Sequence, residues 1–347
     1  MNDAPLLKVE GLKTHFFLVS GTAKAVDGVS FTIEAGETLG IVGESGSGKS
    51  VTAKSIVRLL DSVGRIVDGK VEFEGRDILA LSNKELLEFR GRDVGMIFQN
   101  PMTSLDAVFT VGHQMIENIR AHHDVSRAEA KKISIEALRA VGIPEPEARF
   151  NAYPFELSGG MCQRVIIAMA LCTDVRLIIA DEPTTALDVT VQSQVLKLLK
   201  KVQDEKNVGI LLITHNLGVV WEMCDKVMVM YAGKTVEYTS VDELYRNPRH
   251  PYTWGLLDSM PSLQTDTSQR LNTIKGTPPD LRLTGTCCNF YNRCPYCQDI
   301  CTKKVPDLAE VEPGHFVACH FQTKDARLTR GKVADATPQD KEVGSDA

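Results

Sequence analysis

The chain has 347 residues, of which 43% are hydrophobic and 24% are charged. That length predicts about two domains. The formal net charge of -6 gives no sign of nucleic-acid binding. No apolar run approaches the ~20 residues of a membrane-spanning helix, and residues 1–13 lack the charged-then-apolar pattern of a signal peptide. We therefore expect a cytosolic chain that reaches a membrane only through a partner.

Residues 8 to about 245 have the pattern of one α/β unit. Short runs rich in β-branched residues alternate there with helical patterns, which predicts a mainly parallel sheet covered by helices. The runs lie at residues 38–42, 177–180, 210–213 and 227–231. Residues 111–170 carry more helical patterns and few strand signals, so we expect an inserted helical subdomain there.

The composition changes near Asn247, where Pro, Ser, Thr and Gln become frequent and periodicity is lost. A cysteine-rich segment follows. We therefore place a first domain at residues 1–245 and a second at residues 246–323. Residues 324–347 are polar and charged and lack aromatic residues, which predicts a disordered tail.

A glycine-rich loop follows the first apolar run. The sequence GESGSGKS fits GxxxxGK[ST] and opens a helical pattern, which is the context that a phosphate-binding loop requires. Glycines let backbone N–H groups converge on phosphate oxygens, and the helix N-terminus adds a favourable dipole. Lys49 would reach the β- and γ-phosphates of ATP, and Ser50 would bind Mg²⁺. The predicted nucleotide-binding residues are Gly43, Glu44, Ser45, Gly46, Ser47, Gly48, Lys49, Ser50 and Val51.

Two acidic residues end the apolar run LIIADE. Alone, Asp181 and Glu182 would be interpreted as acids at a strand end before a helix. With a phosphate loop upstream, Asp181 is placed to bind Mg²⁺ through water. Glu182 is then placed to polarise the attacking water as general base.

The sequence LSGGM at 157–161 narrows the interpretation, because it resembles the signature motif of ABC transporter ATPases. Its residues Ser158, Gly159, Gly160 and Met161 share the chain with other motifs of that family in the same order and at similar spacing. These are Gln99 (Q-loop), Asp188 (D-loop), His215 (switch histidine) and Phe16, the aromatic residue against adenine, with Phe17 as the fallback. The resemblance covers residues 8 to about 245.

The resemblance implies the P-loop NTPase fold of ABC ATPases. That fold has a RecA-like parallel-sheet core, an antiparallel β subdomain and a helical subdomain; a small cysteine-rich C-terminal region follows here. Two such subunits hold ATP between them, so Lys49 and Glu182 would act in cis and residues 158–161 in trans. His215 would contact the γ-phosphate, and Gln99 would sense Mg²⁺ and the attacking water. In isolation, we would interpret the SGG as a surface turn and His215 as a core histidine; the ordered set of motifs reverses that choice.

Longer stretches of the sequence indicate a particular branch of the family. LSGGMCQRVIIAMAL and IIADEPTTALDVTVQ look like the oligopeptide/dipeptide importer branch, and Met161, RHPYT at 249–253 and IKGTPPDL at 274–281 resemble its D-type ATPase subunit. The resemblance also implies that residues 100–109 form part of a groove for a helix of the membrane subunit.

Six of the nine cysteines lie within residues 287–319. In a cytosolic chain such a cluster binds metal more often than it forms disulfides. Cys287, Cys294, Cys301 and Cys319 have the spacing C-x6-C-x6-C-x17-C, and members of the branch with that arrangement can bind a [4Fe–4S] cluster. Four thiolates also suit zinc, and free thiols are the third alternative. We favour the cluster, in a structural role.

The implied function is that of an ATP-hydrolysing motor subunit of an importer of di- and oligopeptides, at the cytoplasmic face of the membrane. Its partners would be a second ATPase subunit in a heterodimer, two membrane permease subunits and, indirectly, an extracytoplasmic substrate-binding protein. Nickel, glutathione or another small solute is an alternative cargo.

A soluble ABC ATPase of DNA repair is disfavoured because the stretch from Ser50 to Ser158 is too short for the long coiled coil that such proteins carry there. A soluble ABC ATPase of translation is disfavoured because such proteins hold two ATPase modules in one chain, whereas this sequence has one. A metal-binding or redox protein with vestigial ATPase motifs is disfavoured by four intact residues: Lys49, Asp181, Glu182 and His215.

Overall fold

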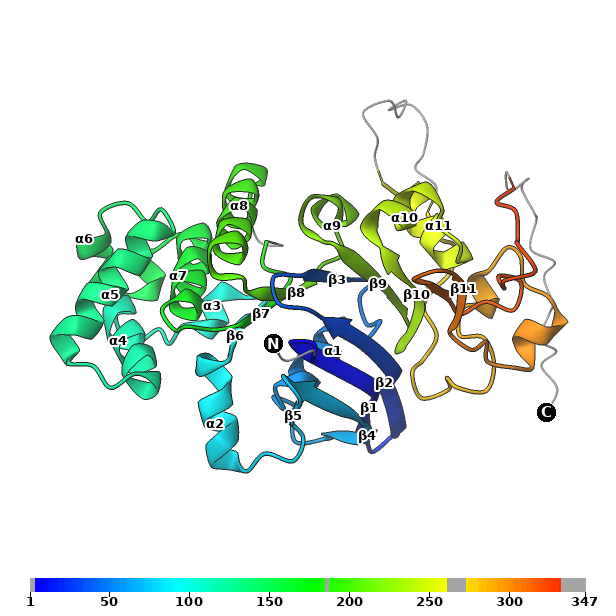
Figure 1. Ribbon diagram of the computed structural model, residues 1–347, viewed down its shortest axis with the longest axis horizontal. Helices are drawn as coiled ribbons and strands as arrows, with labels where there is room; N and C mark the ends of the chain where they lie inside the picture. Colours follow the sequence, from blue (N-terminus) through cyan, green and yellow to red (C-terminus); the bar gives the residue numbers. More distant parts are fainter. Residues whose placement is uncertain (1–3, 185–186, 261–272, 332–347) are drawn as a thin grey trace, which may run out of the picture.

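The computed structural model describes residues 4–184, 187–260 and 273–331. Its centre is an eight-stranded sheet in the order β11-β12-β10-β9-β3-β8-β7-β6 (Figure 1). The strands are β3 (Thr38–Val42), β6 (Val94–Ile97), β7 (Leu177–Asp181), β8 (Gly209–Ile213), β9 (Lys226–Tyr231), β10 (Lys234–Ser240), β11 (Ala309–Glu312) and β12 (His315–Val317). The five strands from β9 to β6 in this order are parallel, as the sequence predicts.

Every residue of β3, β7 and β8 is buried, because the sheet is covered on both faces. Ile210 and Leu212 of β8 face one apolar core, whereas Leu211 and Ile213 face the other. A strand that is apolar at every position therefore fits the centre of a parallel sheet. The loops at the carboxyl ends of these strands meet at one edge, and that edge carries the site.

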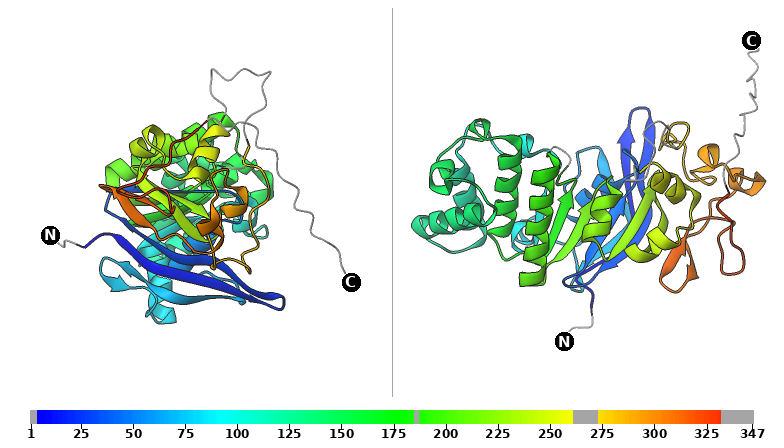
Figure 2. Two further views of the ribbon diagram at one scale, coloured as in Figure 1. Left: turned by 90° about the vertical axis from the view of Figure 1, so that its right-hand side faces the viewer. Right: turned by 90° about the horizontal axis from the view of Figure 1, so that it is seen from above.

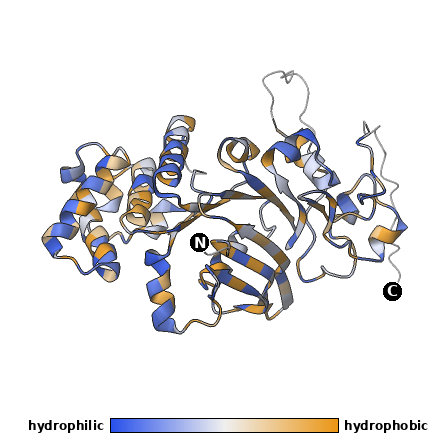
Figure 3. Ribbon diagram, in the orientation of Figure 1, coloured by the Kyte–Doolittle hydropathy of each residue, from blue (hydrophilic) through white to orange (hydrophobic). Residues whose placement is uncertain are grey.

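A second, antiparallel sheet packs over one face of the first. It has the strand order β2-β1-β4-β5, from β1 (Leu7–Leu18), β2 (Gly21–Ile33), β4 (Gly64–Phe73) and β5 (Arg76–Asp77). Polar and apolar residues alternate along β1, β2 and β4 (Figure 3), as expected when one face of a strand is buried. Helix α1 (Lys49–Ile56) shares the core between the two sheets.

Helices gather at the end of the molecule opposite the C-terminal region (Figure 2). They are α3 (Pro101–Ser104), α4 (Val111–His122), α5 (Arg127–Ala140), α6 (Pro146–Phe150) and α7 (Gly159–Leu171). The side chains of Thr110, Ser126 and Ser158 cap α4, α5 and α7 by accepting a backbone N–H in the first turn. Helices α4, α5 and α6 lie within residues 111–170, α7 ends one residue beyond that range, and α3 precedes it.

The remaining helices connect strands or flank the sheet. They are α2 (Asn83–Arg92), α8 (Val189–Lys206), α9 (Leu217–Met223), α10 (Val241–Arg246) and α11 (Pro251–Asp258), with short 3₁₀ turns at Pro154–Glu156, Tyr291–Arg293 and Asp299–Thr302. No helix in the described ranges is long and apolar enough to cross a bilayer.

The C-terminal region continues the central sheet. Strand β12 pairs antiparallel with β10 through Glu237↔Val317 and Tyr238↔Phe316, and β11 completes a hairpin. The predicted division at residues 245/246 therefore does not coincide with a break in the sheet. The tail that the sequence predicts to be disordered starts at residue 324; within its described part, Arg327 donates to Asn247 and Arg330 pairs with Asp258. Residues 332–347 lie outside the described residues.

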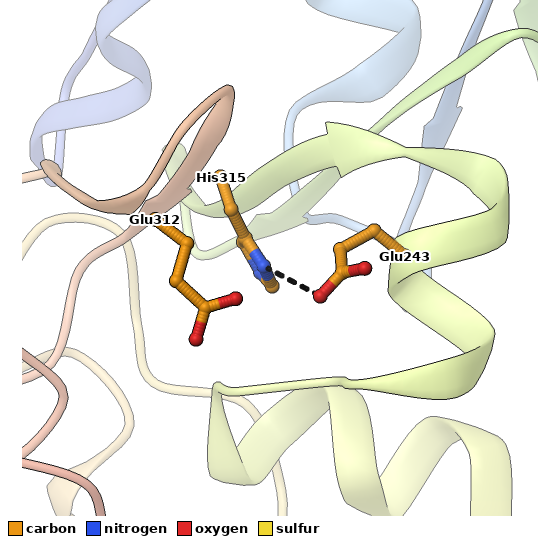
Figure 4. A group of neighbouring side chains, drawn as sticks. All are labelled: Glu243, Glu312 and His315. Atoms are coloured by element: carbon orange, nitrogen blue, oxygen red, sulfur yellow. Dashed lines mark ion pairs between the residues drawn. The ribbon is translucent and has the colours of Figure 1, made fainter.

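A polar network attaches this hairpin to the rest of the chain. His315 on β12 is 1% exposed, and its Nε2 is 2.8 Å from Glu237 on β10. Its Nδ1 lies 3.8 Å from Glu243 on α10, and Figure 4 draws this pair with Glu312. Glu312 on β11 accepts from Asn247 and pairs with Arg249. Because Asn247 Nδ2 also donates to Glu243 at 2.5 Å, donors of the chain itself already engage these carboxylates. The group is thus a hydrogen-bonded clamp.

Candidate nucleotide-binding and catalytic site

The glycine-rich loop joins the central strand β3 to α1. Gly43 has φ 154° and Gly48 has φ 104°. A Cβ on Gly43 would lie 2.2 Å from the carbonyl oxygen of Met230, and one on Gly48 would lie 2.2 Å from that of Ala25. Both glycines are therefore required, by conformation and by space. The loop therefore packs closely against the backbone of β9 and β2.

Lys49 is the first residue of α1, and its side chain turns back into the loop. Its ammonium donates to the carbonyls of Gly43 at 2.8 Å and Glu44 at 2.9 Å. Burial lowers the pKa of Lys49, although the charges of Glu182, Asp181 and Glu44 oppose that shift. The cation is thus held within the loop, in reach of a phosphate bound there.

Ser50 and Asp181 meet beside this loop. The Ser50 hydroxyl donates to Asp181 Oδ1 at 2.8 Å, and Asp181 is 3% exposed at the end of β7. Burial raises the pKa of Asp181, and the hydrogen bond from Ser50 partly offsets this. A hydroxyl and a carboxylate side by side offer the hard oxygen ligands that Mg²⁺ prefers, so the donor set fits this ion.

Glu182 lies where three strand ends converge. Gln99, beyond β6, donates through Nε2 to Glu182 Oε2 at 2.9 Å. Nδ1 of His215, beyond β8, lies 3.4 Å from Glu182 Oε1. The backbone of Glu182 has φ 48°, and its N–H donates to the carbonyl of Ile213 at 2.9 Å. Residues from three separate motifs of the sequence therefore meet at one carboxylate.

The glycine pair of the signature-like motif starts a different helix. Ser158 caps α7 by accepting from the Met161 N–H at 3.3 Å, and both Ser158 and Gly159 are exposed. Gly160 packs against the start of α8, where a Cβ would lie 3.4 Å from Val191. Asp188 caps α8. The start of α7 is therefore open to solvent at Ser158 and Gly159.

The two aromatic candidates for the adenine contact lie near the end of β1. Phe16 is half-buried against Gly64, and Phe17 is 47% exposed with the Arg65 guanidinium 6.0 Å from its ring centroid. The structure brings neither ring into the cluster around Glu182.

Comparisons with known proteins identify the family of the chain. Residues 26–185 match the family model "ABC transporter", and residues 236–301 match "Oligopeptide/dipeptide transporter, C-terminal region". The chain is 50% identical over 315 residues to a probable peptide ABC transporter ATP-binding protein of Sinorhizobium fredii, covering 90% of this chain and 94% of that protein. It is 48% identical over 322 residues to the oligopeptide transport ATP-binding protein OppD of Bacillus subtilis, covering 92% and 90%. The chain belongs to the ABC transporter family.

Solved structures of ABC ATPases have the same fold. The ATP-binding cassette MJ0796, a dimer bound to ADP and Pi, is 26% identical with a TM-score of 0.62, covering 68% of this chain and 98% of that one. CbiO1 of Clostridium perfringens is 29% identical with a TM-score of 0.59, covering 71% and 92%. The chain is thus an ABC ATPase, an enzyme that binds and hydrolyses ATP with Mg²⁺.

Sequence reasoning missed two residues at the phosphate loop of this ABC ATPase. Tyr252 of α11 accepts the Glu44 N–H at 2.8 Å, and Arg293 forms a bidentate ion pair with the Glu44 carboxylate. Tyr252 was noted only as part of the phrase RHPYT. Arg293 gave no signal, because nothing in the sequence connects it to a loop so distant along the chain.

The cysteines of this ABC ATPase line a cavity in the C-terminal region. The four around it are Cys288, Cys294, Cys301 and Cys319; Cys287, one of the four expected, is not among its lining residues. Cys287 and Cys288 are adjacent in an irregular segment, and the expected spacing pattern uses Cys287, whereas the cavity lining includes Cys288. Burial raises the pKa of Cys288 and of Cys294 to about 12.

Proposed function

We propose that this chain is one of two ATPase subunits that power the uptake of di- and oligopeptides through an ABC importer. The observation that carries this is the division of the site: the phosphate loop, Asp181 and Glu182 converge within the chain, whereas Ser158 and Gly159 lie exposed at the start of a different helix. A chain built in this way needs a second ATPase to complete each site. The peptide cargo rests on the C-terminal match and on the names of the relatives.

The ATP site works through residues of both subunits. Lys49 and the backbone N–H groups of the loop would hold the phosphates, and the predicted loop residues are Gly43, Ser45, Gly46, Ser47, Gly48 and Val51. Ser50, Asp181 and Gln99 would hold Mg²⁺, which neutralises phosphate charge. The partner's counterpart of Ser158–Met161 contributes a helix N-terminus to the γ-phosphate. We place the adenine against Phe16, with Phe17 as the alternative.

Glu182 acts as the general base towards the attacking water. Its two carboxylate oxygens face Gln99 and His215, so both neighbours fix its orientation. His215 is 56% exposed and is therefore free to contact a γ-phosphate that arrives from solvent. Asp188, at the start of α8, connects the outward-facing turn with the partner's site.

An exposed apolar surface supports docking to membrane subunits. Val108, Phe109, Tyr153 and Phe155 are 73%, 44%, 39% and 67% exposed. The backbone hydrogen bond from Val111 to Ala152 brings their two segments together, and Tyr153 stacks on Phe155. Clustered apolar residues of this kind mark interaction sites. We assign this surface to a permease helix, which places the chain at the cytoplasmic face of the membrane. The substrate-binding protein acts on the other side.

For the cysteine cavity we propose a [4Fe–4S] cluster held by Cys288, Cys294, Cys301 and Cys319. Among the described residues no three cysteine sulfurs lie within 4.8 Å of one another, whereas tetrahedral zinc with bonds of about 2.3 Å draws its sulfurs to roughly 3.8 Å. Four thiols that line one cavity match the four thiolates that hold such a cluster. When bound, the cluster would supply a covalent cross-link among four loop segments. Zinc is the alternative occupant.

Isolation of the assembly from native membranes, followed by reconstitution into vesicles, tests the proposal. We expect two permease subunits and a second ATPase to copurify, and peptide uptake to require ATP. The Glu182→Gln chain in the same assembly is the control, because it leaves assembly intact and stops turnover. A chain that copurifies without a permease contradicts the importer and favours a non-transport ATPase. Uptake of nickel or glutathione in place of peptide contradicts the cargo alone.

A further inference from the structure

Residues outside the ATPase motifs form hydrogen bonds with the phosphate loop. Arg293, in the cysteine-rich region, donates through Nη1 to Glu44 Oε2 at 2.6 Å and through Nη2 to Glu44 Oε1 at 2.9 Å. Glu44 is the second residue of the loop. The Arg293 side chain is 5% exposed and that of Glu44 is 27% exposed. A bidentate pair with one partner buried is a strong and directional contact.

Arg293 has little freedom to move. Its remaining donors reach the carbonyls of Lys275 at 3.0 Å and Ile274 at 3.3 Å and the hydroxyl of Tyr231 at 3.2 Å. Its guanidinium carbon also lies 5.7 Å from the Tyr231 ring centroid. The fork that holds Glu44 is therefore fixed before any ligand arrives. Such preorganisation is what a positioning residue requires.

Tyr252 holds the same loop residue by its backbone. The Tyr252 hydroxyl accepts the Glu44 N–H at 2.8 Å, and its fully buried ring lies 4.6 Å from Tyr231 and 5.4 Å from Phe290 between ring centroids. The carbonyl of Glu44 in turn accepts from the Lys49 ammonium. A continuous chain of contacts thus runs from the C-terminal region through Glu44 to the lysine that binds phosphate.

Further contacts follow the edge of the site. The backbone N–H of Lys24 donates to the carbonyl of Leu281 at 3.1 Å, beside the β1–β2 hairpin. Asn289 donates to the carbonyl of Ala232 at 3.0 Å, beside the end of β9. The segment from Leu281 to Arg293 therefore runs from the hairpin that carries Phe16 to the phosphate loop. A C-terminal region that was only attached to the ATPase domain would not need hydrogen bonds to the phosphate loop.

We propose that Arg293 and Tyr252 are positioning residues that hold the phosphate loop in its ATP-binding shape, so that this subunit's affinity for ATP depends on its C-terminal region. We call Arg293 and Tyr252 the brace. The cysteine cavity is lined by the sequence neighbour of each, Pro251 beside Tyr252 and Cys294 beside Arg293. Phe290 lines the cavity and also contacts the Tyr252 ring. The cavity and the loop are consequently two sides of one packed unit.

A double-mutant cycle on the full chain tests the brace. The ATP dissociation constant is measured by titration calorimetry for Glu44→Gln, Arg293→Gln and the double variant. We expect each single change to weaken ATP binding about tenfold and the double change to weaken it by about the same factor, because residues of one network are coupled. Arg293→Lys keeps the charge but loses the fork, so it should recover about a third of the affinity on a logarithmic scale.

The matched control is Arg330→Gln, which removes an exposed pair with Asp258 in the same region and should leave ATP affinity unchanged. Single variants that bind ATP within about twofold of the parent chain, or losses that multiply in the double variant, overturn the proposal. If Arg293→Gln fails to fold, Tyr252→Phe decides, since it keeps the ring packing and removes only the acceptor. Unchanged affinity in a folded Tyr252→Phe chain then overturns the brace, and weakened affinity supports it.

Discussion

Nε2 of Gln99 donates to Oε2 of Glu182 at 2.9 Å, joining the residue after β6 to the residue after β7. This contact leaves the Gln99 carbonyl oxygen available to a second partner. If Gln99 binds Mg²⁺ as proposed, one side chain would hold the proposed base through its nitrogen and bind the metal through its oxygen. In this proposal, binding of the metal and orientation of the base would be coupled through a single amide.

The first prediction concerns the proposed general base. Glu182→Gln preserves side-chain size and removes the negative charge, so ATP should still bind while hydrolysis falls by about 10³-fold, within the range for loss of general base catalysis. Phosphate release by the assembly and retention of radiolabelled ATP measure the two effects. Steady-state hydrolysis equal to that of the parent assembly would remove Glu182 from this role.

The second prediction separates two neighbouring cysteines. Cys288 lines the cavity and Cys287 does not, so Cys288→Ser should abolish the brown colour and the bound iron, about four atoms per chain for a [4Fe–4S] cluster. Cys287→Ser is the matched control and should retain both. Iron analysis and visible absorption of protein purified without oxygen are the measurements. A colourless parent chain with stoichiometric zinc would refute the cluster, and loss of colour in Cys287→Ser alone would restore the spacing-based choice.

The third prediction concerns acid stability. Asp27 on β2 pairs with Lys234 on β10 at 2.9 Å. Burial raises the pKa of Asp27, but the hydrogen bond and charge of Lys234, with Lys24 and His15, lower it below its ordinary value overall. The folded state therefore favours the ionised carboxyl, which stabilises the fold above pH ~4 and less so as the pH falls further.

Asp27→Asn should accordingly lower the free energy of unfolding by about 1 kcal/mol at pH 7 and flatten its dependence on pH below ~4. Denaturant unfolding at a series of pH values is the measurement. Asp204→Asn, in an exposed pair with Lys200 at 3.9 Å, is the control and should change little. An unaltered pH dependence in Asp27→Asn would show that this pair does not contribute.

The local parts of this site are encoded in short stretches of sequence. Apolar runs of strand length predict β3, β7 and β8 because only the centre of a covered parallel sheet buries every position. The positions of Lys49, Asp181 and Glu182 follow as well, because each motif specifies a strand end or a helix start. Contacts between motifs on neighbouring parallel strands, such as Gln99 with Glu182, follow from that arrangement.

Longer-range features could not be predicted in this way. The Arg293–Glu44 pair joins distant segments, and neither residue lies in a pattern that names its partner. Strands β11 and β12 have four and three residues, too few for a periodic signal, so their addition to the central sheet came only from the structure. The choice between Cys287 and Cys288 depends on side-chain direction in an irregular segment, which spacing does not specify.

The central claim is that ATP is held between the loop around Lys49 and a partner's glycine-tipped helix. Sedimentation of the Glu182→Gln chain with its copurifying ATPase subunit, with and without Mg·ATP, tests this most directly. ATP should convert the separate chains into a dimer, and Ser158→Arg on this chain, which blocks the exposed turn beside α7, should prevent that conversion. A sedimentation profile indifferent to ATP, or a nucleotide-dependent dimer that tolerates Ser158→Arg, would contradict the account.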